Sequence, residues 1–420
     1  MQPLRGTKDI LPTEIIYWQK IYEITKKILT TYNYHEVRTP IIESTELFLR
    51  SIGNFTDIIN KEMYNFNDQR QRRITLRPEG TAGIARAVIS NKLYLSNKIS
   101  KLWYLGPMFR YERPQRGRQR QFHQLGIECI GSSTPMADIE VIRLAIRILQ
   151  KLKFTNWVLE VNSIGNSRER EKYINDLVMY LNKYYSDLDK DSQKRLIHNP
   201  LRILDSKNLK TQEILIDAPK LKNYLTLEAL NHFNEICDQL CLLNIKYKIN
   251  DNLVRGLDYY NDTAFEIKTK NNNQQNTICG GGRYDELIQQ LGGPHIPSVG
   301  WAIGIERLIT TIENTVEIEK KKVIIYIINL NIYKSDIIWK IVKIIEIYQL
   351  QFEIDLSNTN LNKQLKRANQ IGSKLCFIIG NDEINNQYIT IKWLETSTQQ
   401  KISILHLQNY LKYLKNYLDT

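Results

Sequence analysis

The sequence predicts an α+β protein of more than one domain, and three observations lead to this fold class. The chain has 420 residues, too many for one ordinary hydrophobic core, so two or three domains are expected. Before residue 313, helical patterns occur together with strands that pair in hairpins. Beyond a charged segment at Glu313–Lys322, buried strands alternate with helices, which is typical of a separate α/β domain.

The elements of the first part follow from the spacing of apolar residues and from the positions of proline and glycine. Apolar residues three and four apart predict helices, and alternating ones predict strands. Pro135, preceded by Thr134 as the cap, suits the first position of a helix. In order, the expected elements are an extended entry at Met1–Pro12, a helix at Thr13–Thr31, a strand at Tyr34–Glu43, a hairpin at Met63–Leu76, a turn at Pro78–Gly80 followed by a helix to about Ser90, a hairpin from Leu102 to Ile130, a helix from Pro135 to about Lys153, a strand at Asn156–Asn162, a helix at Thr226–Leu243, a polar hairpin tip at Asn271–Asn276, and a strand that runs through Gly304 into a helix within Ser298–Leu308.

The strand expected at Tyr34–Glu43 contains Pro40, which cannot donate a hydrogen bond to a neighbouring strand. This restricts the segment to a sheet edge or a bulge. Beside exposed apolar residues, such a strand could be a plain edge or a contact between two subunits.

Two regions differ from this mixture of elements. Residues 164–225 are helical and polar, and they predict a small helical module inserted into the first domain. Residues 322–420 form the expected α/β domain. Its elements are strands at Val323–Leu330, Phe352–Leu356, Leu375–Ile379 and Tyr388–Trp393, and helices at Tyr333–Ile347, Leu361–Ile371 and Leu407–Leu418.

The most informative stretch is the hairpin at Phe109–Gly131. One face of its outgoing strand is apolar, whereas the other carries Phe122, Gln124, Gly126 and Glu128. An amide and a carboxylate beside a position without a side chain predict a floor that accommodates a small molecule. With the nearby arginines, this floor suits a substrate that is anionic at one end and cationic at the other. An edge hairpin with a solvated basic tip has the same pattern. The arginines are Arg110 on the incoming strand and Arg113, Arg116, Arg118 and Arg120 in the loop.

Glu79 and Thr81 lie just before the helix that ends near Ser90. A carboxylate and a hydroxyl at this place commonly cap the helix, because its first N–H groups lack partners. The functional alternative is that both side chains bind the ammonium group of a substrate.

A second unusual stretch, LVRGLDYYNDTAFEI at Leu253–Ile267, is followed by CGGGRYD at Cys279–Asp285. Three consecutive glycines allow a ligand or another chain segment to approach closely, but they match neither common nucleotide-binding loop. Further on, Arg307 lies in the first turn of a helix. It could be solvated, or it could bind a phosphate at the mouth of a sheet.

Composition narrows the class of protein. The net charge of +13 and the pI near 9.2 favour a polyanionic partner such as nucleic acid, although a generally lysine-rich proteome would produce the same excess. No apolar run is long enough for a membrane span. The five cysteines are scattered, which indicates a reducing compartment and no structural zinc. We therefore expect a soluble protein without membrane contacts.

The chain resembles the histidyl-tRNA synthetase family of class II aminoacyl-tRNA synthetases along nearly its whole length. The combination and order of the motifs are more specific than any single one, and LVRGLDYY marks the histidine enzyme within class II. The matching stretches are RGTKDILP at Arg5–Pro12, LRPEGTAG at Leu76–Gly83, GPMFRYERPQRGRQRQFHQLGIE at Gly106–Glu128, LVRGLDYYNDTAFE at Leu253–Glu266, GGGRYD at Gly280–Asp285 and GWAIGIERL at Gly300–Leu308.

The resemblance implies an antiparallel class II catalytic domain over residues 1–318, with the insertion at 164–225, and an anticodon-binding domain over 322–420. It also implies a homodimer, whose contact would include Tyr34–Glu43. The implied function is histidine–tRNA ligase: ATP activates L-histidine to histidyl-adenylate, releasing pyrophosphate, and histidine is then transferred to the 3′ end of tRNA(His). Magnesium would arrive on the ATP phosphates, without a metal site built by the protein.

Site residues follow by matching motif positions. Arg110 and Arg255 correspond to the catalytic arginines that face the α-phosphate, Arg255 in a place where related enzymes use a metal. The residues implied for histidine are Glu79, Thr81, Gln124, Glu128, Arg255, Tyr259 and Tyr260. The residues implied for ATP are Arg110, Glu112, Arg118, Arg120, Phe122 and Arg307, with Phe122 stacking on adenine.

The chain departs from many relatives at Gln119, where they have an aromatic residue between two arginines, which puts loop contacts in question. A regulatory paralogue without catalysis would resemble the catalytic domain alone, whereas this chain keeps Arg255, Arg307 and a C-terminal domain.

The N-terminus has no apolar signal core or amphipathic presequence. With much Ile, Asn, Lys and Tyr, this suggests a plastid-encoded protein of the chloroplast stroma or, alternatively, the cytoplasm of an AT-rich bacterium.

Overall fold

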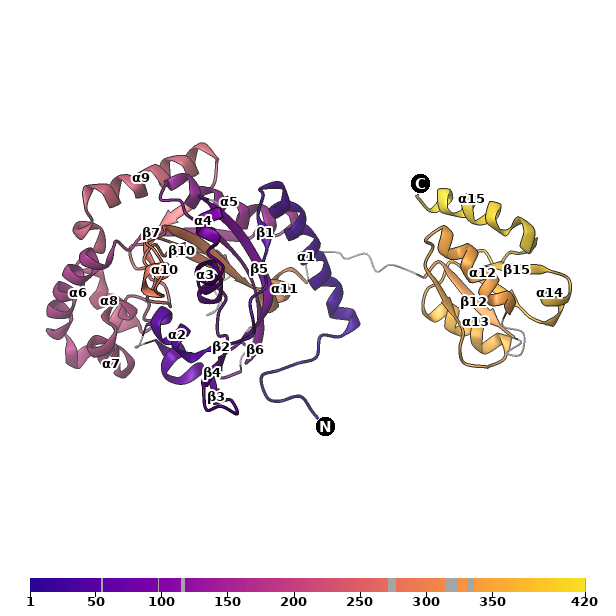
Figure 1. Cartoon of the computed structure of the whole chain (residues 1–420), viewed down its shortest axis with the longest axis horizontal. Helices are drawn as coiled ribbons and strands as arrows, with labels where there is room; N and C mark the ends of the chain where they lie inside the picture. The colour runs from indigo at the N-terminus through magenta and orange to yellow at the C-terminus, as the bar shows by residue number, and fades with distance from the viewer. Residues whose placement is uncertain are drawn as a thin grey trace. The chain divides into compact units, whose positions relative to one another are not determined.

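The computed structural model describes residues 1–53, 56–96, 98–114, 118–270, 277–313, 323–330 and 336–419, and every structural statement below concerns these. The chain divides into two compact units, Met1–Ile318 and Glu319–Thr420 (Figure 1). Several predicted features lie outside the described residues. They are Arg116 in the basic loop, the polar tip at Asn271–Asn276, the charged segment beyond Glu313 and the start of the helix expected from Tyr333.

An eight-stranded sheet forms the centre of the first unit, with the strand order β1-β5-β6-β11-β10-β9-β7-β8. Its neighbouring strands are antiparallel except for the pairs β1–β5 and β7–β8. The mostly antiparallel sheet agrees with what the family resemblance implies. The strands are β1 (His35–Glu36), β5 (Ser100–Phe109), β6 (Gln121–Ile130), β7 (Trp157–Ser163), β8 (Tyr247–Ile249), β9 (Asn261–Thr269), β10 (Thr277–Arg283) and β11 (Ser298–Gly304).

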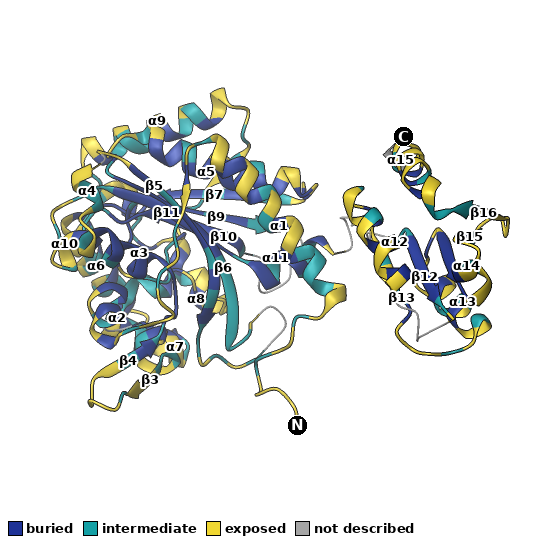
Figure 2. Ribbon diagram, turned by 45° about the vertical axis from the view of Figure 1, so that its right-hand side comes forward, coloured by how far each residue is buried: buried dark blue, intermediate teal, exposed yellow. Residues whose placement is uncertain are grey.

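Helices cover both faces of this sheet and enclose two cores. The larger core joins α1, α5, α9 and α11 to strand residues such as Leu125 and Trp301. The second core lies on the opposite face and includes Tyr104, Tyr260 and residues of α3 and α10. Figure 2 shows the buried strands between these layers. The helices are α1 (Pro12–Thr31), α2 (Thr45–Ile52), α3 (Thr81–Ser90), α4 (Leu93–Ser96), α5 (Pro135–Lys151), α9 (Leu227–Leu242), α10 (Leu287–Gln290) and α11 (Ile305–Ile312).

The region between β7 and α9 folds as short helices, as its polar helical pattern predicts. The first of them starts with a capping box, in which Asn166 and Glu169 satisfy each other's backbone N–H groups. The helices are α6 (Ser167–Asn182), α7 (Lys190–His198) and α8 (Leu209–Ile216), joined by the 3₁₀ turns η2 (Tyr185–Asp187), η3 (Pro200–Ile203) and η4 (Leu221–Tyr224). Their apolar residues join the second core.

The prediction of one continuous strand at Tyr34–Glu43 is wrong. The segment divides around Pro40 into β1, which pairs with β5, and β2 (Ile42–Ser44), which belongs to a separate sheet of order β2-β4-β3. Proline lacks an N–H group and cannot continue a ladder, so the chain changes sheets here. The hairpin expected at Met63–Leu76 is present as β3 (Tyr64–Asn67) and β4 (Arg73–Leu76), preceded by the π-helical turn η1 (Ile58–Glu62).

The second unit contains a five-stranded sheet of order β13-β12-β14-β15-β16. Its first three strands are parallel and the last two pairings antiparallel, around a core of residues such as Ile327, Phe377 and Leu411. The alternating pattern missed α14 and β16, which are short and polar. The elements are β12 (Ile325–Asn329), α12 (Asp336–Ile347), β13 (Phe352–Ile354), α13 (Leu361–Gln370), β14 (Leu375–Ile379), α14 (Asn381–Asn385), β15 (Tyr388–Trp393), β16 (Gln399–Ser403), η5 (Ile404–His406) and α15 (Leu407–Asp419).

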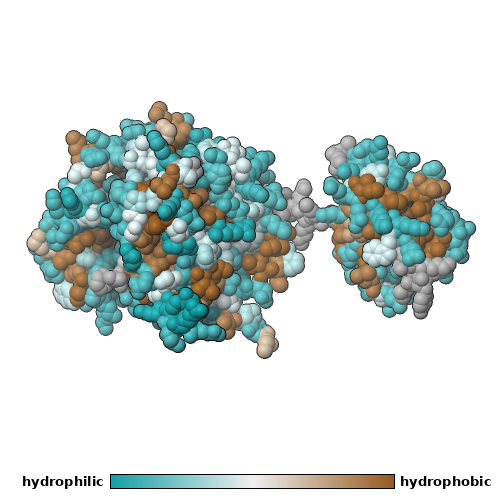
Figure 3. All heavy atoms as spheres, in the orientation of Figure 1, coloured by the Kyte–Doolittle hydropathy of each residue, from teal (hydrophilic) through white to brown (hydrophobic). Residues whose placement is uncertain are grey.

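The surface of the first unit is largely hydrophilic on the face shown in Figure 3, with separate hydrophobic areas among the hydrophilic side chains. Within the part of the chain that the structure describes, no helix combines the length and the apolar character that crossing a bilayer requires. Exposed apolar side chains include Ile41 and Ile42, beside Pro40.

Candidate active site

A pocket of about 400 Å³ opens in the first unit on the sheet face that carries Gln124. It collects side chains from the start of α3, the hairpin β5–β6, the loop before β9, and the junction of β11 with α11. The motifs that are far apart in sequence therefore meet in one place. Of the predicted site residues, the lining contains Glu79, Thr81, Arg110, Glu112, Arg118, Phe122, Gln124, Arg255, Tyr259, Tyr260 and Arg307.

Glu79 caps the helix α3 and also lines the pocket. Its carboxylate accepts hydrogen bonds from the backbone N–H groups of Thr81 (2.7 Å) and Ala82 (2.8 Å), which confirms the capping interpretation. The Tyr259 hydroxyl donates to the same carboxylate at 3.4 Å. Burial raises the pKa of Glu79, while the backbone hydrogen bonds lower it. The Glu79 side chain therefore both caps α3 and forms part of the pocket wall.

Glu128 is 1% exposed and lies behind the pocket wall, outside the lining. It accepts hydrogen bonds from Thr81 Oγ1 at 2.7 Å and from the Tyr284 hydroxyl. Burial raises the pKa of its carboxyl group to about 8, against the lowering effect of these two donors. Sequence reasoning missed Tyr284, although it lies inside the GGGRYD motif.

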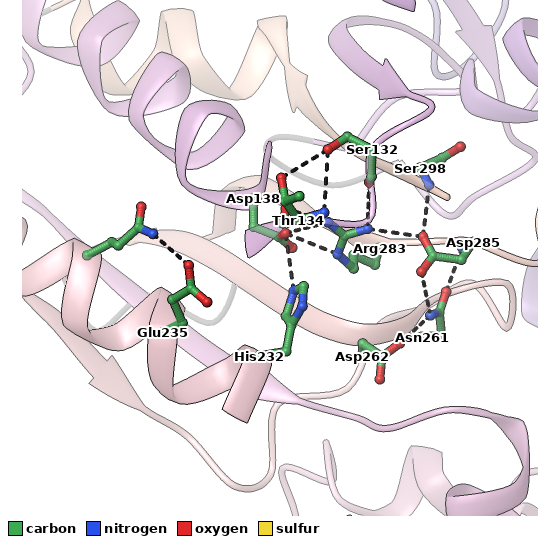
Figure 4. A network of polar contacts seen from close by, with 11 residues as sticks. Ser132, Thr134, Asp138, His232, Glu235, Asn261, Asp262, Arg283, Asp285 and Ser298 are labelled. Carbon is green, nitrogen blue, oxygen red and sulfur yellow. Dashed lines mark hydrogen bonds and ion pairs between the residues drawn. The ribbon is translucent and has the colours of Figure 1, made fainter. Parts of the chain in front are cut away.

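A buried ion-pair network holds the segment on either side of Tyr284 (Figure 4). Arg283 is 1% exposed and donates two hydrogen bonds to Asp138 Oδ2, at 2.7 and 3.0 Å, and one to Asp285 at 3.3 Å. It also donates to the carbonyl oxygens of Ser132 and Thr134, at the start of α5. The network ties β10 to α5 and so fixes the backbone that carries Tyr284.

The sequence suggested that Gly126 leaves room for a substrate, but the structure shows that it does not. A Cβ atom at this position would lie 2.3 Å from the ring of Tyr104, so the ring of Tyr104 takes the space. Tyr104 was not predicted as a site residue. Its hydroxyl and Gln124 Oε1 are buried and make no hydrogen bond within the described part of the chain. The free oxygen of Gln124 fits a donor such as an ammonium group.

Arg255 forms an ion pair with Glu266 on β9, a residue that the sequence did not single out. Its guanidinium lies 5.6 Å from the ring centroid of Tyr260. Opposite it, a Cβ atom at Gly280 would lie 2.1 Å from Arg255 Nη2. The close approach expected at the three glycines is therefore confirmed, and here it makes room for the arginine.

The other pocket arginines come from the hairpin and from α11. Arg110 donates from Nε to the Pro78 carbonyl at 2.9 Å, and its guanidinium lies 5.2 Å from the ring centroid of Phe122. Arg118 pairs with Glu112 at 3.1 Å. Arg307 donates to the Thr277 carbonyl, and its pKa is lowered by burial and by Arg118. These three arginines, Arg255 and Arg202 of the insertion line one pocket, and five cations suit a polyphosphate.

Arg120 is placed differently from the expectation that it faces the pocket. Its guanidinium lies 3.8 Å from the ring centroid of Tyr111, and its backbone N–H donates to the Gly6 carbonyl at 2.7 Å. It is absent from the pocket lining. In this arrangement Arg120 connects the N-terminal segment to the hairpin.

A pH prediction follows from Glu128. Its folded-state pKa of about 8 exceeds the value of about 4.3 for an exposed glutamate, so the folded protein binds this proton more tightly. The stabilisation from this proton is complete at low pH and is lost as pH rises through the folded pKa. The free energy of unfolding should therefore fall, relative to a Glu128→Gln variant, between about pH 5 and pH 8. Urea titrations across this range measure it, and parallel curves for the two proteins would contradict it.

The architecture and the pocket define a class II aminoacyl-tRNA synthetase: a mostly antiparallel sheet with arginines from its hairpin, from the loop before β9 and from α11 around a polar floor. The histidyl-tRNA synthetase family model matches residues 6–308, and an anticodon-binding domain model matches residues 324–414. The chain belongs to the histidyl-tRNA synthetase family.

Individual relatives agree with this assignment. The chain is 62% identical over 399 residues to the chloroplastic histidine–tRNA ligase of Gracilaria tenuistipitata var. liui, covering 95% of each chain. It is 48% identical over 403 residues to the histidine–tRNA ligase of Cyanothece sp., covering 96% of this chain and 94% of that one. The solved structure of apo histidyl-tRNA synthetase from S. aureus is 33% identical and superposes with a TM-score of 0.82, covering 98% of this chain and 100% of that one.

Proposed function

We propose that the pocket of the first unit performs both steps of the family's reaction. The activity is that of a histidine–tRNA ligase, which activates L-histidine with ATP to histidyl-adenylate and pyrophosphate and then transfers histidine to the 3′ end of tRNA(His). The observation that carries this proposal is the meeting of five arginines with Glu79 and Gln124 in one pocket. Cations suit the phosphates, and acceptors suit the ammonium group of an amino acid.

The first step adds negative charge to an already anionic α-phosphate, so the site must supply fixed cations there. We assign this role to Arg110 and Arg255. Arg307 and Arg118 would bind the outer phosphates, and Phe122 would stack on adenine. Arg120 lies against the Tyr111 ring and outside the pocket lining. We therefore assign it to holding the N-terminal segment against the hairpin and not to binding phosphate.

Histidine would bind on the neighbouring floor. Gln124, Glu79 and Thr81 are assigned to its ammonium group, although the Thr81 hydroxyl is also bonded to Glu128. Glu128 and Tyr260 would bind the two imidazole nitrogens, with Tyr259 beside them. Buried polar partners reject side chains that leave them unpaired, which favours histidine over apolar competitors. Because Glu128 lies outside the pocket lining, it would bind the imidazole only after the side chains between it and the pocket rearrange.

Magnesium would neutralise charge on the ATP phosphates and would be held mainly by them, with Glu112 as one of the carboxylates that line the pocket. No group of three or more histidine, cysteine or acidic side chains suited to a metal ion occurs among the described residues.

The remaining assignments concern the rest of the chain. Residues 1–318 would be the catalytic domain with the insertion at 164–225, and residues 322–420 would bind the anticodon. The exposed Ile41 and Ile42 beside Pro40 are consistent with a homodimer contact, which sedimentation would test. The chloroplastic relative supports a place in the chloroplast stroma, and the bacterial relative keeps a bacterial cytoplasm as the alternative.

Histidine-dependent exchange of pyrophosphate into ATP tests the proposed function. The purified chain should catalyse this exchange with histidine and not with other amino acids. It should also attach histidine to tRNA(His). A folded protein that binds ATP but shows no histidine-dependent exchange would exclude the proposal.

A further inference from the structure

The helical insertion contacts the loop that carries the proposed histidine and α-phosphate residues. This loop, residues 254–260, lies between β8 and β9 and is neither helix nor strand over its length. Three side chains from the insertion bind it. Arg202 Nη2 donates to the Gly256 carbonyl at 2.9 Å, Asn199 donates to Asp258 Oδ1 at 3.3 Å, and Arg170 donates to the Tyr260 carbonyl.

These contacts are made at or directly beside the loop residues that line the pocket. Gly256 directly follows Arg255, and Asp258 directly precedes Tyr259. A loop without regular secondary structure depends on such bonds for its shape, because few backbone groups fix each other. Arg202 also packs closely, since a Cβ atom at Gly256 would lie 3.4 Å from both of its terminal nitrogens.

The insertion also contributes to the pocket itself. Arg202 and Asp205 line it together with Arg255 and Gly256. The loop is held from the opposite side by α2, because the Asp258 N–H donates to the Ile52 carbonyl at 3.1 Å. Arg202 thus lies where the insertion, the loop and the pocket meet.

We propose that Arg202 is a positioning residue for the first step of the reaction, holding Arg255 and Tyr260 in place through the Gly256 carbonyl before any tRNA is present. Asn199 and Arg170 assist it at the next two points. The insertion is then part of the adenylation site. This inference rests on the proposed function.

Pyrophosphate exchange without tRNA tests the inference. Arg202→Ala should lower kcat by about 10- to 100-fold, because small displacements of a catalytic group cost this much. The KM for ATP should change little. Arg202→Lys should restore most of the rate, since one N–H group suffices for the Gly256 carbonyl. The matched control is Lys210→Ala, which removes an exposed cation of the same insertion, paired with Asp187, and should behave as wild type.

Counting active sites separates positioning from a general loss of structure. Rates are divided by the fraction of protein that forms histidyl-adenylate in a single-turnover burst. An Arg202→Ala protein with wild-type kcat per active site overturns the inference, as does a lysine variant no better than alanine. If Arg202→Ala does not fold, Asn199→Ala carries the test, with a severalfold loss expected and an unchanged rate as refutation. An inactive wild type would refute the proposed function instead.

Discussion

Replacing Arg255 with alanine should lower the rate of histidine-dependent pyrophosphate exchange by about 100- to 1,000-fold. The Arg255 guanidinium lies in the pocket, where it forms an ion pair with Glu266 and packs closely over Gly280. It is therefore oriented before substrate arrives. A preorganised donor stabilises charge that develops in the transition state without a cost of reorganisation. Histidine binding should remain measurable, because other residues supply the acceptors for its ammonium group.

Exchange kinetics and equilibrium binding of histidine measure the two effects separately. Arg72→Ala is a suitable control, because Arg72 is 72% exposed at a hairpin tip and pairs with Asp68 outside the pocket. That control should retain the wild-type rate. A wild-type rate in Arg255→Ala would remove this residue from the catalytic assignment.

Replacing Arg283 with methionine should lower the free energy of unfolding by roughly 3–5 kcal/mol. The change removes the guanidinium from Asp138, which is fully buried and otherwise pairs with His232, a cation only when protonated. A buried carboxylate without compensation costs far more than the lost attraction in an exposed pair. The loss should also loosen Tyr284, which donates to Glu128.

Urea denaturation of the variants measures this effect. The double variant Arg283→Met with Asp138→Leu should be more stable than Arg283→Met alone, because it removes both charges. Lys222→Met, which breaks the exposed pair with Asp251, should cost about 1 kcal/mol or less. Equal losses in Arg283→Met and Lys222→Met would contradict the argument from burial.

Local patterns predicted the elements well where one physical rule dominated. The hairpin strand β6 ends at Ile130 as expected, and the helix expected at Thr226–Leu243 is observed as α9, with Thr226 as its N-cap. Pro40 restricted its strand to a sheet edge or a bulge but did not predict the change of sheet, since that depends on which strands lie beside it. The short polar elements α14 and β16 have too few apolar residues for a periodic signal.

The candidate site was predictable to the extent that it consists of motif residues. The pocket lining contains Arg110, Arg255 and Arg307 from three separate motifs. What the sequence could not show is which side chains bind each other. Glu266 pairs with Arg255 of the same motif, and Tyr104 packs against Gly80 and Gly126, but only the fold shows these contacts. The same holds for Arg202, which is outside every motif.

The order of strands in the large sheet also bears on how the protein is made. The hairpin strand β6 has β5 on one side and β11 on the other, with Leu125 opposite Ile303. Between β6 and β11 the chain runs through α5, the insertion and β9. A growing chain that has left the ribosome only as far as α9 therefore exposes β6 as an open edge. Distant strand pairing is slow and leaves such edges open to aggregation. Chaperones that shield the unfinished sheet should matter more for this unit than for the small second unit, whose strands pair within a short stretch of chain.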